Sequence, residues 1–293
     1  MIPPKTVSEP QLLLAFLFQT WPEVKRTNVK QWLKFGAVRV NDQVVTRHNQ
    51  ELKAGDQVSI HPTKAPPPAP DLPQGMSILY EDSDIIVVHK PAHLLTISTE
   101  KETDKTAYHA ITGYVRDRAR TGVARVWIVH RLDRETSGVL VFAKSEEAKE
   151  TLQSNWTTAE KSYLALVEGK PPAQSGTLRT HLDESQPHKV FACKEGPETR
   201  EAITHYRVLR QGMGRTLLEV TLETGRRHQI RVQLSQAGCP IVGDEKYGAK
   251  SNPARRMALH AAVLKLTHPH TGKEMVFESP LAPELLKLLP SEV

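Results

Sequence analysis

Cysteine is scarce in this sequence of 293 residues, and long apolar runs are absent. Cys193 and Cys239 are far apart and lack metal-ligand spacing, which excludes a disulfide scaffold and a cysteine zinc site and favours a reducing compartment. No apolar run approaches the roughly 20 residues that span a bilayer. The N-terminal segment MIPPKTVSEP also lacks the basic-then-apolar pattern of a signal peptide. We therefore expect a cytoplasmic protein without a membrane partner.

Several catalytic motifs are also missing. The patterns GxGxxG, the P-loop, HExxH and GxSxG do not occur, so the sequence offers no support for dinucleotide binding, nucleotide hydrolysis, zinc proteolysis or serine-hydrolase chemistry. The thirteen histidines do not fall at metal-ligand spacings, and His268 and His270 merely flank a proline. We expect no bound metal.

Positive charge is concentrated at one end of the chain. The net charge is +6, from 39 Lys and Arg against 33 Asp and Glu. Residues 1–65 contain nine of the cations and five of the acids, so the remainder is close to neutral. A small basic module attached to a near-neutral body is typical of a domain that docks on a polyanion.

The basic module has the pattern of a small α/β domain. We expect helices over 12–21 and 27–35, the second capped by Thr27 and ended by Gly36, and strands over 37–41 and 57–60. In the second helix the apolar side chains share one face and cations recur on another, which is also compatible with an ordinary solvated face. The segments KRTNVKQWLKFGAVRVND and ELKAGDQVSI resemble the RNA-binding domain of the ribosomal protein S-four type. This resemblance implies an RNA backbone as the contact of Arg26, Lys30, Lys34 and Arg39.

A proline-rich stretch separates this module from the rest. Residues 61–75 contain six prolines, which supply no backbone donors and stiffen an extended chain, as in a semi-rigid linker. We predict an RNA-binding domain over 1–62, a linker over 63–75 and a catalytic domain over 76–293. In the last, strands outnumber helices and mostly connect as hairpins, so we predict an α+β fold with a mixed, largely antiparallel sheet and flanking helices.

The central motif is HRLDRETSG, residues 130–138, between two short apolar strands. A loop fixed at both ends by core strands is a rigid place for a reactive side chain. Asp133 lies between Arg131 and Arg134, whose positive charge would keep the carboxylate ionised. Such an acid suits a nucleophile or an electrostatic stabiliser, although it could also simply form an ion pair that fixes a turn.

Two further polar motifs, KSYLALVEG and TGRRHQIR followed by GDEKYG, complete a pattern with HRLDRETSG. Together with LHAAVLKLTHPHTG and FESPLAP, they resemble the RluA-type pseudouridine synthases over roughly residues 76–282. The resemblance implies an RNA uridine isomerase that needs no cofactor, because isomerisation gains and loses no atom. Ribosomal RNA is the first expected substrate and transfer RNA the second, and we expect a monomer.

The resemblance also implies roles for individual residues. Asp133 matches the essential aspartate and Arg231 the arginine that pairs with it. Tyr163 matches the tyrosine that stacks on the target base, and Ile230 closes the other side of the pocket; without the family, both would be ordinary core residues. The remaining expected substrate contacts are Arg131, which would fill the place of the flipped nucleotide, and Arg226 and Arg227, which would contact phosphates.

One departure and two alternatives stay open at this point. His93 stands where the family usually has glycine, which puts the geometry of that loop in doubt. A non-catalytic RNA-binding or ribosome-assembly factor could keep the fold without turnover. Glycoside or nucleoside hydrolysis would need a second, acid-acting carboxylate, for which Glu135 is the only near neighbour.

Overall fold

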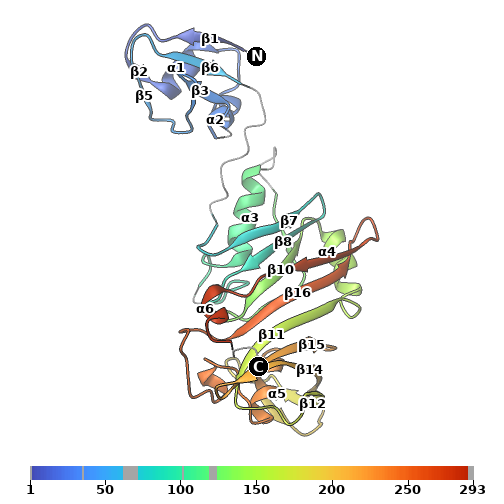
Figure 1. Ribbon diagram of the computed structural model, residues 1–293. Coiled ribbons are helices and arrows are strands. Elements are labelled where there is room, and N and C mark those ends of the chain that lie inside the picture. Colours follow the sequence, from blue (N-terminus) through green and yellow to red (C-terminus); the bar gives the residue numbers. More distant parts are fainter. Residues whose placement is uncertain (1, 35, 62–71, 101, 119–123, 290–293) are drawn as a thin grey trace. The chain divides into compact units, whose positions relative to one another are not determined.

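The computed structural model describes residues 2–34, 36–61, 72–100, 102–118 and 124–289 (Figure 1). The chain divides into two compact units, Met1–Asp71 and Leu72–Val293. Of the predicted linker, residues 63–71 lie outside the described part, and residues 72–75 belong to the second unit.

The first unit combines short strands with two helices. In chain order its elements are β1 (Ile2–Thr6), β2 (Gln11–Leu12), α1 (Leu13–Thr20), α2 (Arg26–Lys34), β3 (Val38–Val40), β4 (Gln43–Val44), β5 (Glu51–Leu52) and β6 (Gln57–Ile60). One sheet has the order β1-β6-β3-β4, and β2 pairs with β5. Val29 and Leu33 of α2 are buried in the core of this unit, as their helical spacing predicts. The predicted cap at Thr27 is wrong, because α2 begins one residue earlier.

Strand β1 was not predicted, because prolines at positions 3 and 4 argue against a strand. A proline supplies no hydrogen to the ladder and is tolerated where one side of the strand is unpaired. The structure fits this rule, because β1 is an edge strand that pairs only with β6 in its sheet, with a register shift between Ile2 and Lys5.

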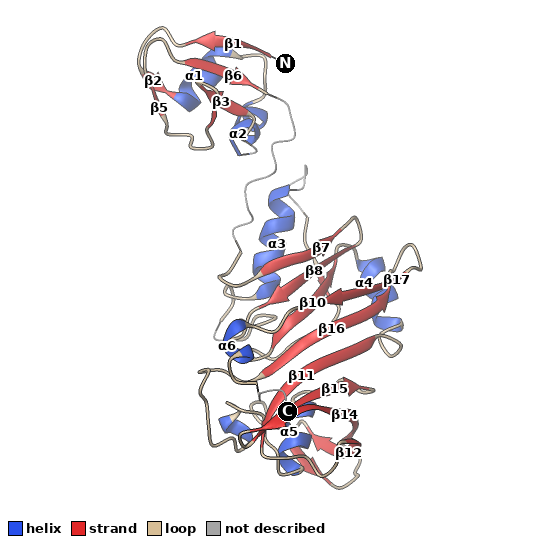
Figure 2. Cartoon of the chain, in the orientation of Figure 1, coloured by secondary structure: helices blue, strands red, loops and turns tan. Residues whose placement is uncertain are grey.

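The second unit is built on one large sheet (Figure 2). Its strands are β7 (Ser77–Glu81), β8 (Ile85–Lys90), β9 (Trp127–Ile128), β10 (Ser137–Ala143), β11 (Glu160–Glu168), β12 (Ser175–Asp183), β13 (Phe191–Cys193), β14 (Arg200–Gly212), β15 (Arg215–Leu222), β16 (Leu259–Thr267) and β17 (Glu274–Glu278). The helices are α3 (Ala107–Arg118), α4 (Glu146–Ser154), α5 (Gln229–Gln236) and α6 (Pro283–Leu286), with a 3-10 turn at Glu245–Tyr247.

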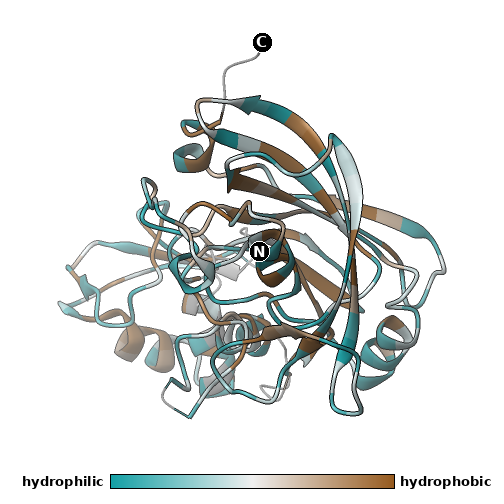
Figure 3. Cartoon of the chain, turned by 90° about the horizontal axis from the view of Figure 1, so that it is seen from below, coloured by the Kyte–Doolittle hydropathy of each residue, from teal (hydrophilic) through white to brown (hydrophobic). Residues whose placement is uncertain are grey.

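The sheet runs in the order β13-β12-β14-β15-β11-β16-β10-β8-β7, with β17 on β16 and β9 on β10. Among the described strands, β10 and β16 form a parallel pair and the other pairings are antiparallel. This confirms the predicted α+β class with a mixed, largely antiparallel sheet. The strands carry both apolar and polar residues along their lengths, as expected for a sheet with differently covered faces (Figure 3).

Hydroxyl side chains cap the starts of two helices in this unit. The Ser145 side chain accepts a hydrogen bond from Ala148 N at 3.1 Å and caps α4. Thr106 likewise accepts from His109 N at 3.1 Å at the start of α3. Gly238, at φ 78°, follows α5 in the left-handed region, as a helix C-terminus requires.

Candidate active site

The loop that carries Asp133 is fixed by buried polar contacts at its start. The imidazole of His130 packs on Trp156 with ring centroids 4.5 Å apart, and its Nε2 accepts from Val141 N of β10 at 3.2 Å. Burial lowers the pKa of His130 to about 3, so this nitrogen stays an acceptor at neutral pH. The backbone carbonyl of Leu132, two residues after His130, accepts a hydrogen bond from the Thr96 hydroxyl at 2.7 Å. The predicted rigidity of the loop therefore has a clear structural basis.

The end of the loop is fixed as well. The ammonium of Lys90 is buried and donates to the carbonyls of Pro91, Leu94 and Arg134, at 2.9, 2.7 and 3.3 Å. Burial lowers the pKa of Lys90 to about 7. The same segment contains His93, which adopts φ 65°, a region that glycine favours but histidine tolerates. The positive φ of this position is one that glycine adopts without strain, which fits the glycine that the family resemblance implies here.

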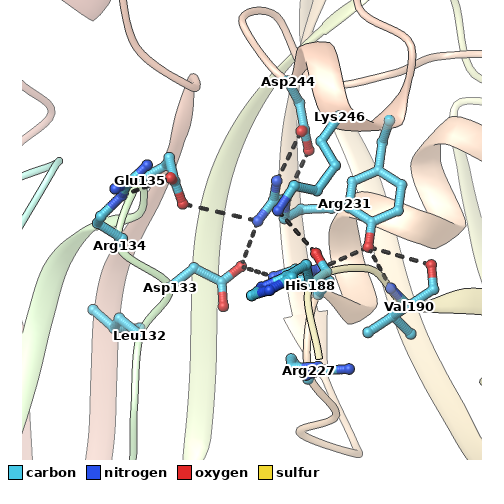
Figure 4. Close-up of polar contacts among 12 residues, drawn as sticks. Leu132, Asp133, Arg134, Glu135, His188, Val190, Arg227, Arg231, Asp244 and Lys246 are labelled. Carbon is cyan, nitrogen blue, oxygen red and sulfur yellow. Dashed lines mark hydrogen bonds and ion pairs between the residues drawn. The ribbon is translucent and has the colours of Figure 1, made fainter. Parts of the chain in front are cut away.

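Arg231, in the first turns of α5, links two carboxylates (Figure 4). Its Nη1 donates to Asp133 Oδ2 at 3.0 Å, and its Nε and Nη2 bind both oxygens of Asp244 at 2.7 and 2.9 Å. The side chain is only 4% exposed. Burial alone would lower the pKa of Arg231, but the bonds and charges of Asp244 and Asp133 outweigh it and raise the pKa. The guanidinium is therefore a permanent positive charge beside Asp133.

The cations next to Asp133 in sequence do not play this part. Arg134 donates to Glu135 at 3.0 Å and is largely exposed, and Arg131 is also exposed. The hydrogen bond to Asp133 comes instead from Arg231 of α5, the pairing that the family resemblance implies. Burial raises the pKa of Glu135, but bonds from its own backbone and from Arg134 outweigh burial and lower it.

Asp133 lines a small pocket of about 70 Å³, together with most of the other predicted site residues. Six of the predicted residues, from three separate motifs, line it: Arg131, Asp133, Tyr163, Arg226, Ile230 and Arg231. Burial, followed by the charge of Asp133, raises the pKa of Tyr163, so its hydroxyl stays protonated. Because the volume is below the roughly 300 Å³ of typical ligand sites, a nucleotide enters only if exposed wall residues such as Arg131 move.

A larger surface groove, of about 770 Å³, lies around the β14–β15 turn and is lined by residues such as Lys170, Met213 and Arg215. It contains none of the residues that surround Asp133. Of these two, the smaller pocket is the candidate site, because it brings together a carboxylate, its arginine and an aromatic ring.

Arg227 is the predicted contact that the structure leaves off the pocket lining. Its Nη1 donates to Pro187 O at 2.8 Å, and its Nη2 donates to Glu184 O at 2.9 Å and to Gln186 O. The guanidinium thus organises the loop between β12 and β13. It is placed to shape this loop more than to meet a phosphate.

Sequence reasoning missed three residues that surround Asp133 and Arg231. His228 precedes α5 with φ 54°, and its Nε2 lies 3.8 Å from Asp133 Oδ2. Its Nδ1 lies 2.7 Å from the hydroxyl of Tyr247. Asp244 and Tyr247 both belong to GDEKYG, a motif that was recognised without a role for these members. The signal was present in the quoted motifs, but their spacing alone does not indicate which side chains point inward.

In the first unit, the predicted RNA-contacting residues are largely on the surface. Arg26 and Lys30 are exposed, and Arg26 stacks over the Phe18 ring at 5.2 Å. Arg39 is half-buried and donates to Asp42 O at 3.0 Å. The side chain of Lys34 lies outside what the structure describes.

Asp82, Asp84 and His268 could in principle hold a metal ion, because their ligand atoms all lie within 4.8 Å of one another. Their contacts have a structural explanation instead. His268 Nε2 lies 2.9 Å from Asp82 Oδ2, and Asp82 also accepts from the Tyr80 hydroxyl and two backbone amides of the turn after β7. Both carboxylate oxygens of Asp82 are therefore already used by the protein.

The chain is similar to known RNA pseudouridine synthases. The family model "RNA pseudouridylate synthase" matches residues 84–236. The uncharacterized RNA pseudouridine synthase YlyB of Bacillus subtilis is 36% identical, over 94% of this chain and 91% of that protein. Ribosomal large subunit pseudouridine synthase D of Escherichia coli K12 is 32% identical, over 97% and 92%.

A solved structure shares the fold. Human RNA pseudouridylate synthase domain containing 4 superposes with a TM-score of 0.61, over 73% of this chain and 95% of that one, at 24% identity. No helix in the described ranges has the length and apolar character needed to cross a membrane. From its sequence match, its fold and its site, the chain belongs to the RluA-type RNA pseudouridine synthases, which are RNA isomerases.

Proposed function

We propose that this chain converts specific uridines of ribosomal RNA to pseudouridine through Asp133. The observation that carries the proposal is the 3.0 Å contact between Asp133 and Arg231, inside a pocket that also contains Tyr163. The Escherichia coli relative is named as a synthase of the large ribosomal subunit, which favours ribosomal over transfer RNA.

The reaction breaks the glycosidic bond of uridine, turns the uracil within the pocket and rejoins it through carbon five. It gains and loses no atom, so this chain's side chains can supply the chemistry. Arg231 keeps the Asp133 carboxylate oriented beside the sugar. Tyr163 offers its ring to the uracil face, and Ile230 closes the opposite wall.

The target base must leave its stack to reach this pocket. Arg131 is exposed at the pocket rim, where its long side chain can take the place that the flipped nucleotide vacates. Arg226 is exposed beside it and is suited to a flanking phosphate, since one nitrogen is used on Glu201 O at 3.2 Å and the others remain for RNA.

We propose further that the first unit is an RNA-binding domain of the ribosomal protein S-four type, acting in the cytoplasm within a monomer. Two exposed cations of α2, Arg26 and Lys30, support this role, with Lys34 and Arg39 as further contacts. The unit has its own core, as a docking module requires.

Two other functions are less well supported. A glycoside hydrolase would need a protonated acid near Asp133, but the pKa of Glu135 is lowered. A protein that only binds RNA does not need an arginine buried between two carboxylates, because the desolvation of these charges offsets most of the stability that their attraction contributes.

The test is release of tritium from RNA labelled at carbon five of uridine. The wild type should release it from ribosomal RNA of a strain that lacks the enzyme, and Asp133→Asn should release none. Asp133→Asn must still bind the RNA and unfold at a similar temperature. If the wild type releases tritium from neither ribosomal nor transfer RNA, the proposal is wrong.

A further inference from the structure

His228 is held in the wall of the Asp133 pocket by its backbone and by a hydrogen-bonded tyrosine. Its side chain is 12% exposed, and the residue adopts the left-handed region directly before α5. Tyr247 Oη lies 2.7 Å from His228 Nδ1 and also accepts from Val190 N at 2.9 Å. The ring therefore has one orientation, with Nδ1 toward the tyrosine and Nε2 toward Asp133.

The geometry favours the tautomer that carries the proton on Nε2. Burial lowers the pKa of His228 to about 4, so the ring is neutral at pH 7. The single hydroxyl hydrogen of Tyr247 has a shorter path to His228 Nδ1, 2.7 Å, than to Val190 O, 3.2 Å. The Asp133 carboxylate then stabilises the N–H that faces it.

This N–H and the carboxylate are too far apart to bond directly. The distance from His228 Nε2 to Asp133 Oδ2 is 3.8 Å. A single oxygen about 2.8 Å from each atom fits between them. To satisfy both, this oxygen must accept a hydrogen bond from His228 and donate one to Asp133. A hydroxyl can do both, whereas a carbonyl or a phosphodiester oxygen can only accept.

We propose that His228 and Asp133 together form a binding subsite for the ribose 2′-hydroxyl of the target uridine. This inference rests on the proposed function, because it places the substrate sugar against Asp133. Within an RNA chain the 3′ and 5′ oxygens are esterified, so the 2′-hydroxyl is the one hydroxyl of the target nucleotide. It is attached next to the carbon whose bond to uracil is broken. His228 thereby becomes a residue that distinguishes RNA from DNA and positions the sugar.

The experiment uses a stem-loop RNA that contains the mapped target uridine, and the same RNA with 2′-deoxyuridine or 2′-fluorouridine at that position. Dissociation constants and initial rates are measured for the full-length wild type and for His228→Asn. Asparagine tolerates the positive φ, and its amide reaches no further than Nδ1 of the histidine. The exposed His188 supplies a matched control, His188→Asn, because only its backbone carbonyl is used in the site region, by Lys246.

We expect the wild type and His188→Asn to bind the 2′-deoxy RNA about tenfold more weakly or worse, as for loss of a hydrogen bond to a charged group. The 2′-fluoro RNA should be equally weak, because fluorine cannot donate to Asp133. For His228→Asn, the dissociation constant of the 2′-deoxy RNA should exceed that of the all-ribose RNA by less than about threefold. Tyr247→Phe removes the hydroxyl that orients the His228 ring, and it should also reduce this difference in affinity. If His228→Asn fails to fold, the result for Tyr247→Phe tests the subsite in its place.

Equal binding of ribo and deoxy RNA by the wild type would overturn the subsite, and so would a full penalty retained in both variants. These outcomes leave the proposed function intact if the all-ribose RNA is isomerised. Failure of the wild type to isomerise any RNA would instead remove both.

Discussion

Arg231 binds Asp133 with one nitrogen while its other two bind both carboxylate oxygens of Asp244. Asp244 is 2% exposed, whereas Asp133 is 25% exposed. The buried acid thus fixes the arginine, and the remaining nitrogen of the arginine, Nη1, binds the acid that lines the pocket. Two of the predictions below follow from the site around this arrangement.

Replacing Asp244 by asparagine removes a buried charge while keeping its size. Loss of one partner of a buried ion pair should lower the free energy of unfolding by about 3 kcal/mol and reduce tritium release at least tenfold. Urea denaturation and the tritium assay measure the two effects. The control is Glu245→Gln, at the exposed residue that follows Asp244, and it should change neither the free energy of unfolding nor the tritium release. An Asp244→Asn enzyme of wild-type activity would show that Arg231 needs no anchor.

Tyr163 can be tested by separating its ring from its hydroxyl. Tyr163→Phe keeps an aromatic face for stacking, and Tyr163→Leu does not. Since stacking on a base contributes about 1–3 kcal/mol, the leucine variant should bind substrate RNA roughly 5- to 150-fold more weakly than the phenylalanine variant. Fluorescence anisotropy with a stem-loop RNA checks this. Equal affinities of the two variants would exclude stacking as the role of Tyr163.

Gly138, at the start of β10, should not accept a side chain. A Cβ there would lie 2.1 Å from Ala261 O of the parallel strand β16, and its φ is +121°. Gly138→Ala must therefore separate two central strands, and we expect a loss of more than about 4 kcal/mol or failure to fold. Gly214→Ala is the matched control, with φ +74° and no atom within 4 Å, and should cost about 1 kcal/mol. Comparable unfolding midpoints for the two would contradict the close approach.

Acid should destabilise the fold through His260. This ring is fully buried, with Nε2 2.9 Å from Ser279 O and Nδ1 2.8 Å from Ser137 Oγ. Burial lowers its pKa to about 4, below the roughly 6.5 of an unfolded chain. Between these values only the unfolded state gains the proton, so stability is lost as the pH falls from about 6.5 toward 4.

At pH 5 this loss should amount to about 2 kcal/mol from His260 alone. Urea denaturation at pH 7 and pH 5 measures it, with His260→Asn as the comparison, which should lose correspondingly less between the two pH values. An identical pH dependence in the wild type and His260→Asn would rule out this contribution.

The first unit should contribute salt-dependent affinity for RNA. Replacing Arg26 and Lys30 together by glutamine removes up to two phosphate contacts, and the slope of log K against log salt should become shallower by up to about 2. Filter binding at several salt concentrations measures the slope. Arg179 and Arg207 are already paired with Glu201 and Glu219, so their double replacement by glutamine is the control and should leave the slope unchanged. If both double variants behave alike, α2 does not face RNA.

Elements with a local signal could be predicted from sequence. The β-rich run KSYLALVE at 161–168, the serine before two acids at Ser145 and the alternating runs after residue 200 are short-range patterns of this kind, and the structure has a strand, a helix cap and hairpins there. Strand β12 could not be predicted, because in its sequence SGTLRTHLD only Leu178 and Leu182 are large apolar residues, which gives no alternating hydrophobic pattern. Pairing with β14 makes it a strand, and no short window contains that information.

The site shows the same limit at longer range. A reactive acid at Asp133 was inferred from its own loop, but its ionic partner lies 98 residues away and was assigned only through the family resemblance. Local charge pointed to Arg134, which binds Glu135 instead. His228 and Asp244 were missed because only the folded structure shows that His228 lies beside Asp133 and that Asp244 binds Arg231.

The sheet order has a consequence for when the enzyme can act during its synthesis. Strand β16, near the end of the chain, lies between β10, which follows Asp133, and β11, which contains Tyr163. Until β16 has emerged from the ribosome, nothing in this sheet joins those two strands, and the aspartate and its aromatic partner have no fixed separation. A nascent chain therefore cannot modify RNA with its first half, and activity reports that the last large strand has been inserted.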